Sequence, residues 1–183
     1  MDYSTSSSDI ERVVVTGEQI QNRLSELARQ VESDYAGRDL LLIGVLKGAV
    51  MTVADFSRAL NRHIEMDWMA VSSYGSGTKS SGVVRILKDL DRDITGRDVL
   101  IIEDIVDTGL TLAWLKSNLE SRGAKSVNIL TMLRKPDAAK VTVDVKYVGF
   151  DIPSDFVVGY GLDFNEKYRN LDFIGVLSPK MYS

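Results

Sequence analysis

Three carboxylates and a glycine-containing turn follow an apolar run in the stretch VLIIEDIVDTGLTL, residues 99–112. Carboxylate oxygens accept hydrogen bonds from sugar hydroxyls and hold hard cations such as Mg²⁺. The turn Thr108–Thr111 precedes an apolar-periodic segment, and the unpaired amides at a helix start attract a phosphate. Acids and an anion site are compatible if they contact different parts of one substrate. A ligand with one phosphate, a ribose diol and a metal-bound diphosphate would account for the whole stretch.

The place of these acids in the chain supports this interpretation. Glu103 and Asp104 end the apolar run and Asp107 opens the next loop, and ligands of open α/β sheets bind beyond the carboxyl ends of the strands. Gly109 allows the backbone to approach a ligand closely. The G-x-x-x-x-G-K-[ST] pattern of a P-loop is missing, so the predicted phosphate site is of another kind. The alternative is one helix-capping aspartate and two solvated acids.

Buried apolar runs alternate with amphipathic segments, and this alternation predicts the elements that position the acids. Thr16 and Gln19 have the spacing of a capping box, and apolar residues follow at helical intervals. The pattern predicts an α/β domain with a mainly parallel twisted sheet, flanked by helices and joined by right-handed crossovers. Strands are expected over 39–46, 68–73, 83–87, 99–104 and 126–133, and helices between residues 16 and 37, 49 and 60, and 112 and 123.

The pattern changes after Pro136, where three short strand candidates follow without long helices: 146–150, 156–160 and 173–177. We expect them to form, in part, a small β-rich subdomain that covers the end of the sheet. Residues 1–12 are interpreted as a disordered polar tail and residues 13–183 as a single domain. Within that domain, the Gly/Ser-rich segment near 72–84 is expected to be a mobile loop.

The composition excludes several classes of protein. The chain has 183 residues and a net charge of −4, with one histidine and no cysteine. A non-specific nucleic-acid binder is normally basic, so we expect no nucleic-acid partner. Disulfides, thiolate catalysis and multi-histidine metal sites are excluded. No apolar run approaches the roughly 20 residues that span a bilayer, and no signal peptide is recognisable, so we expect no membrane partner and a cytoplasmic location.

The stretch at 99–112 resembles the phosphoribosyl-pyrophosphate (PRPP) signature of type I phosphoribosyltransferases: an apolar strand, two acids, two apolar residues and D-T-G-x-T. Other segments are similar to the hypoxanthine-guanine phosphoribosyltransferase family, and the similarity runs from about Val13 onward. These segments are VLKGAV (45–50), AVSSYGSGTKSSG (70–82), LRKPDAA (133–139) and DFVVGYGLDFNEKYRNL (155–171). The resemblance implies the type I phosphoribosyltransferase fold, with the β-rich part as a purine-binding hood whose purine-binding segment lies near 134–173.

On the sugar side, the resemblance implies that Glu103 and Asp104 orient the ribose hydroxyls and Mg²⁺. It makes Asp107 the candidate general base at purine N7, with electrostatic support or loop capping as the open alternative. The 5-phosphate would lie on the loop formed by Asp107, Thr108, Gly109, Leu110 and Thr111. The leaving pyrophosphate would meet Lys47, Gly48 and Arg169. In this family the peptide before the lysine, here Leu46–Lys47, is often cis.

On the purine side, the resemblance implies that Lys135 donates to the 6-oxo group and that Phe156 stacks on the ring. The backbone of Val157 would read the N1/N2 edge. Asp163 would hold a second Mg²⁺ beside the pyrophosphate. The pair Ser73-Tyr74 lies in a segment similar to the family's lid, which would close and exclude water.

The implied reaction is purine salvage: ribose 5-phosphate passes from PRPP to N9 of hypoxanthine or guanine, giving IMP or GMP and pyrophosphate. A homodimer or homotetramer is expected by the same resemblance. Three alternatives stay open. They are transfer to another base such as xanthine, uracil or orotate, an RNA-binding regulator with the same fold, and an aspartyl-phosphate phosphatase or receiver. Scattered basic residues count against the second, and the D-T-G-x-T spacing counts against the third.

Overall fold

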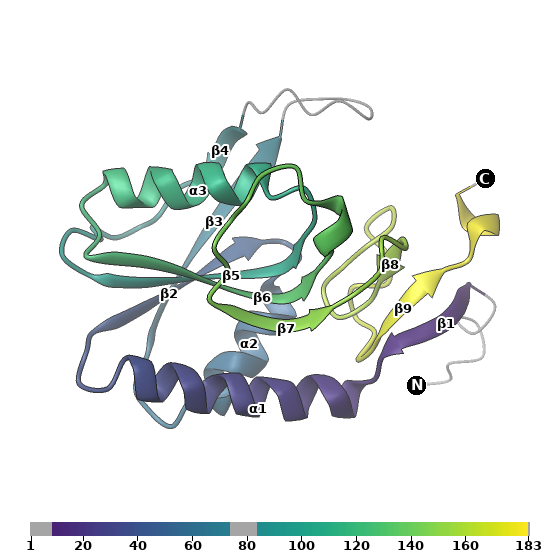
Figure 1. Cartoon of the computed structure of the whole chain (residues 1–183), viewed down its shortest axis with the longest axis horizontal. Coiled ribbons are helices and arrows are strands. Elements are labelled where there is room, and N and C mark those ends of the chain that lie inside the picture. The colour runs from purple at the N-terminus through teal and green to yellow at the C-terminus, as the bar shows by residue number, and fades with distance from the viewer. Residues whose placement is uncertain (1–8, 74–83, 183) are drawn as a thin grey trace.

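The computed structural model of the protein describes residues 9–73 and 84–182, which form a six-stranded sheet and a smaller three-stranded sheet (Figure 1). The larger sheet has the strand order β4-β3-β2-β5-β6-β7. All its neighbouring pairs are parallel except β3 with β4. The predicted α/β class with a mainly parallel sheet is therefore confirmed. The strands are β2 (Leu40–Leu46), β3 (Glu65–Ser73), β4 (Val84–Lys88), β5 (Asp98–Val106), β6 (Ser126–Arg134) and β7 (Tyr147–Asp151).

Strands β2 and β5 lie at the centre of this sheet, and their sequences show why. β2 is entirely apolar, and β5 has a buried apolar centre from Val99 to Ile102, as expected for parallel strands covered on both faces. Their register pairs Leu40 with Asp98 and Gly44 with Ile102. The residues that follow β2 and the acids near the carboxyl end of β5 therefore emerge at the same edge of the sheet.

Helices α1 (Gly17–Asp34) and α2 (Val50–Ala59) cover one face of the sheet, and α3 (Leu110–Ser121) covers the other (Figure 1). The predicted capping box of α1 is present: the Thr16 hydroxyl accepts from the Gln19 amide, and the Gln19 side chain accepts from the Thr16 amide. One stripe of α1 is buried, which fixes the face that packs on the sheet. Within the described residues, no helix is long and apolar enough to cross a membrane.

The hood consists of the three-stranded sheet β1-β9-β8, the loop 159–173 and the adjoining residues 152–156 and 178–182. Strand β1 (Ile10–Val15) pairs antiparallel with β9 (Ile174–Leu177), which pairs antiparallel with β8 (Val157–Val158). Short 3₁₀ turns, Pro136–Ala138 and Pro179–Met181, follow β6 and β9. Both described chain ends therefore lie in the hood, at one end of the molecule (Figure 1).

One sequence-based expectation about this part is corrected. The disordered tail was expected to reach residue 12, but Ile10 onward is strand, because β9 supplies a hydrogen-bonding partner that local sequence does not reveal. Residues 1–8 of that tail lie outside the described part. The three short strands are expected only in part in the hood: β8 and β9 lie there, and β7 extends the larger sheet as a parallel neighbour of β6.

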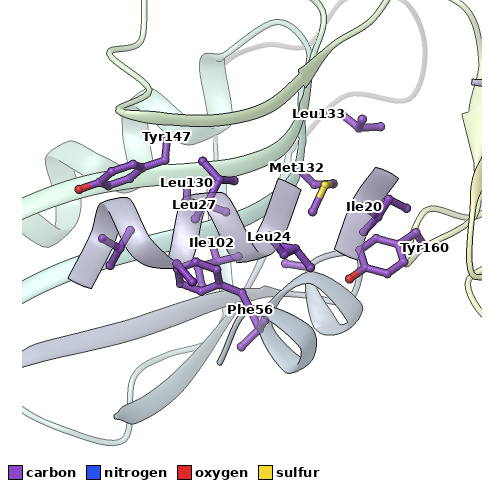
Figure 2. Packing of buried hydrophobic residues seen from close by; sticks show 14 of the residues in the cluster. Ile20, Leu24, Leu27, Phe56, Ile102, Leu130, Met132, Leu133, Tyr147 and Tyr160 are labelled. Carbon is purple, nitrogen blue, oxygen red and sulfur yellow. The ribbon is translucent and has the colours of Figure 1, made fainter. Parts of the chain in front are cut away.

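The sheet separates two hydrophobic cores because successive residues of a strand point to opposite faces. Leu42 and Ile102 belong to the cluster under α1 and α2, whereas Ile43 and Ile101 pack in the cluster that includes Leu115 of α3. Figure 2 shows the first cluster, in which Tyr160 points from the hood toward the two helices. The hood is therefore attached to the same core that supports the sheet.

Candidate active site

The predicted phosphate loop lies between the end of β5 and the start of α3. Gly109 is the N-cap of α3 and has φ of +79°, a conformation that glycine adopts without strain. The segment surrounds a cavity of about 130 Å³ lined by residues between Glu103 and Leu112. Since a helix start carries partial positive charge, a cavity at this place suits a phosphate.

The two acids at the end of β5 lie in an environment that disfavours their charged forms. Glu103 is buried, and burial followed by the charge of Asp104 raises its pKa well above the usual value. Burial also raises the pKa of Asp104, and outweighs the hydrogen bond that the Ile105 amide donates to its carboxylate at 2.7 Å. A cation or hydroxyl donors placed here would favour the charged forms of both groups and lower their pKa values.

The chemistry of this pair fits a magnesium ion. Mg²⁺ takes oxygen ligands and is commonly held by one or two carboxylates together with substrate phosphates. Glu103 and Asp104 are adjacent carboxylates of this kind. Within residues 9–73 and 84–182, no three aspartate, glutamate, histidine or cysteine side chains are close enough together to hold a metal ion without a ligand from the substrate.

The loop after β2 touches the acids directly. A Cβ atom on Gly48 would lie 1.6 Å from Oδ2 of Asp104, and a Cβ on Gly161 would lie 1.9 Å from the Gly48 carbonyl oxygen. Only a hydrogen fits in these two gaps, so three distant segments meet at Gly48. The Leu46–Lys47 peptide that precedes this junction is cis, as the family resemblance implied.

Lys47 and Arg169, both assigned by resemblance to the pyrophosphate, are brought together by Glu166. One carboxylate oxygen of Glu166 lies 3.0 Å from Lys47 Nζ and the other 3.2 Å from Arg169 Nη2. These contacts, led by the Lys47 hydrogen bond, lower the pKa of Glu166. The sequence analysis missed Glu166, whose only local signal is its position three residues before Arg169.

Arg169 also fixes the hood loop near this junction. Its Nη1 donates to the Gly161 carbonyl oxygen at 2.7 Å, and its Nη2 lies 2.8 Å from the carboxylate of Asp163. Asp163, assigned by resemblance to a second Mg²⁺, further accepts a hydrogen bond from the Glu166 amide. Lys47, Arg169, Glu166 and Asp163 therefore form one cluster of charged side chains at the edge of the hood.

A second cavity, of about 300 Å³, lies beside the first. Lys135 lines it and is buried at the end of β6, where its amide donates to the Val106 carbonyl at 2.9 Å. Asp107 and Gly109 line both cavities. The candidate general base therefore stands on the wall between the phosphate loop and the predicted purine-binding lysine.

The other predicted purine contacts belong to the hood. Phe156 precedes β8 and is 44% exposed, and Val157 begins β8 and is buried. No residue of the hood lines the cavity beside Lys135 as the described residues define it. Of the predicted lid pair, Ser73 ends β3 and pairs with Val84, while Tyr74 lies outside the described residues.

The fold and the strand-end site together define a class of protein. Residues 15–165 match the model of the phosphoribosyl transferase domain family. The match spans the larger sheet, the phosphate loop, the acids and the first part of the hood loop, as far as Asn165. The chain therefore belongs to the phosphoribosyl transferase domain family.

Comparison with individual proteins narrows the family. The chain is 60% identical over 180 residues to a hypoxanthine-guanine phosphoribosyltransferase of Mycobacterium tuberculosis, covering 95% of this chain and 89% of that protein. It is 51% identical over 174 residues to one of Bacillus subtilis, covering 95% and 97%. A crystal structure of a hypoxanthine phosphoribosyltransferase from Staphylococcus aureus superposes with a TM-score of 0.96 and 46% identity, covering 100% of both chains. The chain belongs to the hypoxanthine-guanine phosphoribosyltransferase family.

Proposed function

We propose that the protein is a purine-salvage enzyme that transfers ribose 5-phosphate from PRPP to N9 of hypoxanthine or guanine in a Mg²⁺-dependent reaction. The products are IMP or GMP and pyrophosphate. The observation that carries the proposal is the wall shared by the two cavities, formed by Val106, Asp107 and Gly109. A sugar phosphate on one side and a purine near Lys135 on the other would meet there. The relatives' names supply the two bases.

The bond from ribose C1 to the pyrophosphate oxygen breaks with positive charge on the sugar and negative charge on the leaving group. Lys47 and Arg169 are held side by side by Glu166 in the free protein. Phosphate oxygens would replace the Glu166 carboxylate as their partner, and charge-assisted bonds to the guanidinium suit that exchange. When bound at Glu103 and Asp104, Mg²⁺ would add positive charge near the leaving group.

The purine loses one proton as its N9 bonds to C1. Asp107 is exposed and stands on the wall between the cavities, so its carboxylate is the candidate acceptor of that proton at N7. Lys135 would donate to the 6-oxo group, which orients the base and favours 6-oxopurines over bases without this acceptor. The 5-phosphate, gripped at 108–111, would hold C1 at the wall.

One experiment tests the proposal directly. The protein is incubated with PRPP and Mg²⁺ and, in separate reactions, with hypoxanthine, guanine, xanthine, adenine, uracil or orotate, and pyrophosphate and nucleotide are measured together. With hypoxanthine or with guanine, we expect one pyrophosphate to be released for each nucleotide formed. Turnover should be lost when EDTA removes the metal. No nucleotide with either 6-oxopurine would overturn the proposed function, and turnover in EDTA would overturn the metal dependence alone.

The cytoplasmic location and the homodimer or homotetramer stay predictions. Light scattering after size exclusion would measure the assembly. A monomer mass of about 20 kDa would contradict the expected oligomer.

A further inference from the structure

Three aromatic rings of the hood contact one another at its surface, and we call them the aromatic trio: Phe156, Phe164 and Tyr182. The Phe156 and Phe164 ring centroids are 5.9 Å apart, with the planes almost perpendicular at 89°. Tyr182 lies 5.5 Å from Phe156 and 6.3 Å from Phe164. Each ring therefore touches both others at distances and angles typical of favourable aromatic pairs.

The members of the trio come from three separate places in the chain. Phe156 precedes β8, Phe164 lies in the hood loop, and Tyr182 ends the 3₁₀ turn after β9. Phe156 is 44% and Tyr182 48% exposed. An isolated half-exposed phenylalanine would sample several rotamers, so the two neighbours restrict a side chain that the core leaves free.

The backbone places Tyr182 at this ring through a short chain of contacts. The Leu177 amide of β9 donates to the carbonyl of Phe156 at 3.0 Å, and the Ser178 amide donates to the carbonyl of Asp9 at 2.7 Å. The 3₁₀ turn then closes with the Tyr182 amide donating to the Pro179 carbonyl at 3.2 Å. The position of the last described ring is thereby tied to β9 and to the N-terminal strand that pairs with it.

We propose that Tyr182, together with Phe164, is a positioning residue for the purine. The two rings hold Phe156 in one orientation, so that its remaining exposed face is presented to the base before the base arrives. If the Phe156 ring is already ordered, stacking of the base costs less conformational entropy than if the ring must become ordered on binding. This inference rests on the proposed function and on the purine-stacking role of Phe156 that the family resemblance implies.

The expected signature is a change in purine KM without a matching change in turnover. In Tyr182→Ala the purine KM rises about fivefold, as loss of one aromatic pair implies, while kcat and the KM for PRPP stay within about twofold of wild type. Tyr182→Phe keeps wild-type values, because the ring and not the hydroxyl makes the contact. Tyr182→Leu keeps apolar bulk without a ring and raises the purine KM as the alanine variant does.

The matched control is Met181→Ala, since Met181 is the neighbouring exposed apolar side chain, at 39% exposure, and is outside the trio. It is expected to match wild type in all three constants. Thermal melting of each variant checks that the hood is folded. Purine KM values in Tyr182→Ala and Tyr182→Leu equal to wild type would overturn the proposal, as would a Tyr182→Phe variant that behaves like Tyr182→Ala.

A double-mutant cycle separates this inference from the assignment on which it rests. Phe156→Ala is expected to raise the purine KM more than Tyr182→Ala, and adding Tyr182→Ala to Phe156→Ala should cause no further rise. If Phe156→Ala raises the purine KM and Tyr182→Ala does not, the positioning role of Tyr182 is wrong and the stacking role of Phe156 is retained. If Phe156→Ala leaves the purine KM unchanged, the stacking assignment fails and the inference falls with it.

Discussion

The strand-end site and the hood place polar groups by different means. From Glu103 to Thr111 the strand-end site is one contiguous strand, turn and helix start, and β5 is hydrogen-bonded to a parallel strand on each side. The hood joins residues from both described chain ends and has non-glycine residues with positive φ at four positions: Tyr160, Asn165, Glu166 and Tyr168. Such conformations persist only where surrounding contacts hold them.

This difference suggests that the two regions affect different kinetic constants. A site on a buried central strand holds reacting groups firmly, so changes there should act on turnover. A hood made of several linked contacts distributes the binding of the base, so a change at any one contact should act mainly on purine KM and by less. The predictions below test that difference, in order of decreasing effect.

The largest effect is expected from Asp107→Asn at the strand-end site. If Asp107 accepts the purine proton, kcat falls by about 100-fold or more, while the KM for PRPP changes little because the amide keeps the size of the side chain. Steady-state kinetics with both substrates varied measures this. Asp39→Asn, at the opposite end of the sheet and exposed, is the control. Unchanged turnover in Asp107→Asn would rule out the base role.

Gly48→Ala tests the junction between the two regions. The added Cβ would lie 1.6 Å from Asp104 Oδ2, so the carboxylate or the loop must move, and a displacement of about 1 Å can lower kcat/KM by about 100-fold. Gly37→Ala is the control for backbone strain without a clash: a Cβ at Gly37 meets no atom within 4 Å, but its φ of +69° strains an alanine, so stability should fall while kcat/KM stays near wild type. Wild-type kcat/KM for PRPP in Gly48→Ala would show that Asp104 does not need its position.

Lys135→Ala should separate base binding from sugar binding. Loss of a charged donor to the 6-oxo group raises the purine KM about tenfold, and the KM for PRPP stays near wild type. Lys125→Ala is the control, since Lys125 stands just before the same strand β6 at its opposite end and its side chain is 61% exposed. An unchanged purine KM in Lys135→Ala would remove Lys135 from the base site.

The smallest effect is expected from Tyr160→Phe, which removes one hydrogen bond between the hood and α2. The Tyr160 hydroxyl donates to the Asp55 carboxylate at 2.7 Å, and its loss should lower the free energy of unfolding by about 1 kcal/mol at pH 7. Tyr147→Phe is the counterpart, because the Tyr147 hydroxyl donates to Asp34 at 2.6 Å away from the site. Both variants lose stability, but only Tyr160→Phe should raise the purine KM. The rise should be about twofold if half of the lost free energy also weakens purine binding.

The pH dependence of Tyr160→Phe has a definite sign. Burial raises the pKa of Asp55, but hydrogen bonds from Tyr160, Gln21 and Arg58 outweigh it and hold the pKa below the usual value. A lowered folded-state pKa stabilises the protein above the unfolded pKa of about 3.9, and this stability is lost as pH falls through the folded pKa. Urea unfolding should therefore show the wild type and variant differing more at pH 7 than at about pH 3. An equal difference at both would contradict the role of the Asp55 charge.

Much of the fold could be predicted because it depends on local pattern. The apolar runs of β2 and β5, the capping box at Thr16 and the helical spacing in α1 all act within a few residues, so the sequence predicts them and the structure confirms them. The contiguous phosphate loop was visible for the same reason. The assignment of roles to its residues stays a prediction.

The pairing of distant segments was not predictable in this way. Nothing near Ile10 indicates that it pairs with Leu177, and nothing near Glu166 indicates that its carboxylate joins Lys47 to Arg169. Short strands such as β7 give no periodicity long enough to identify their neighbours. These contacts depend on chain reversal over many residues, which local propensity does not encode.

The sequence by itself determined the α/β class, the order of most elements and the contiguous stretch of acids and phosphate loop, because each depends on spacing within a few residues. Only the tertiary structure decided that Gly48 meets both Asp104 and Gly161, that Asp107 separates two cavities and that Tyr182 reaches Phe156. The physical reason is close packing: atoms far apart in the chain come within contact distance only when the sheet, helices and hood are assembled together.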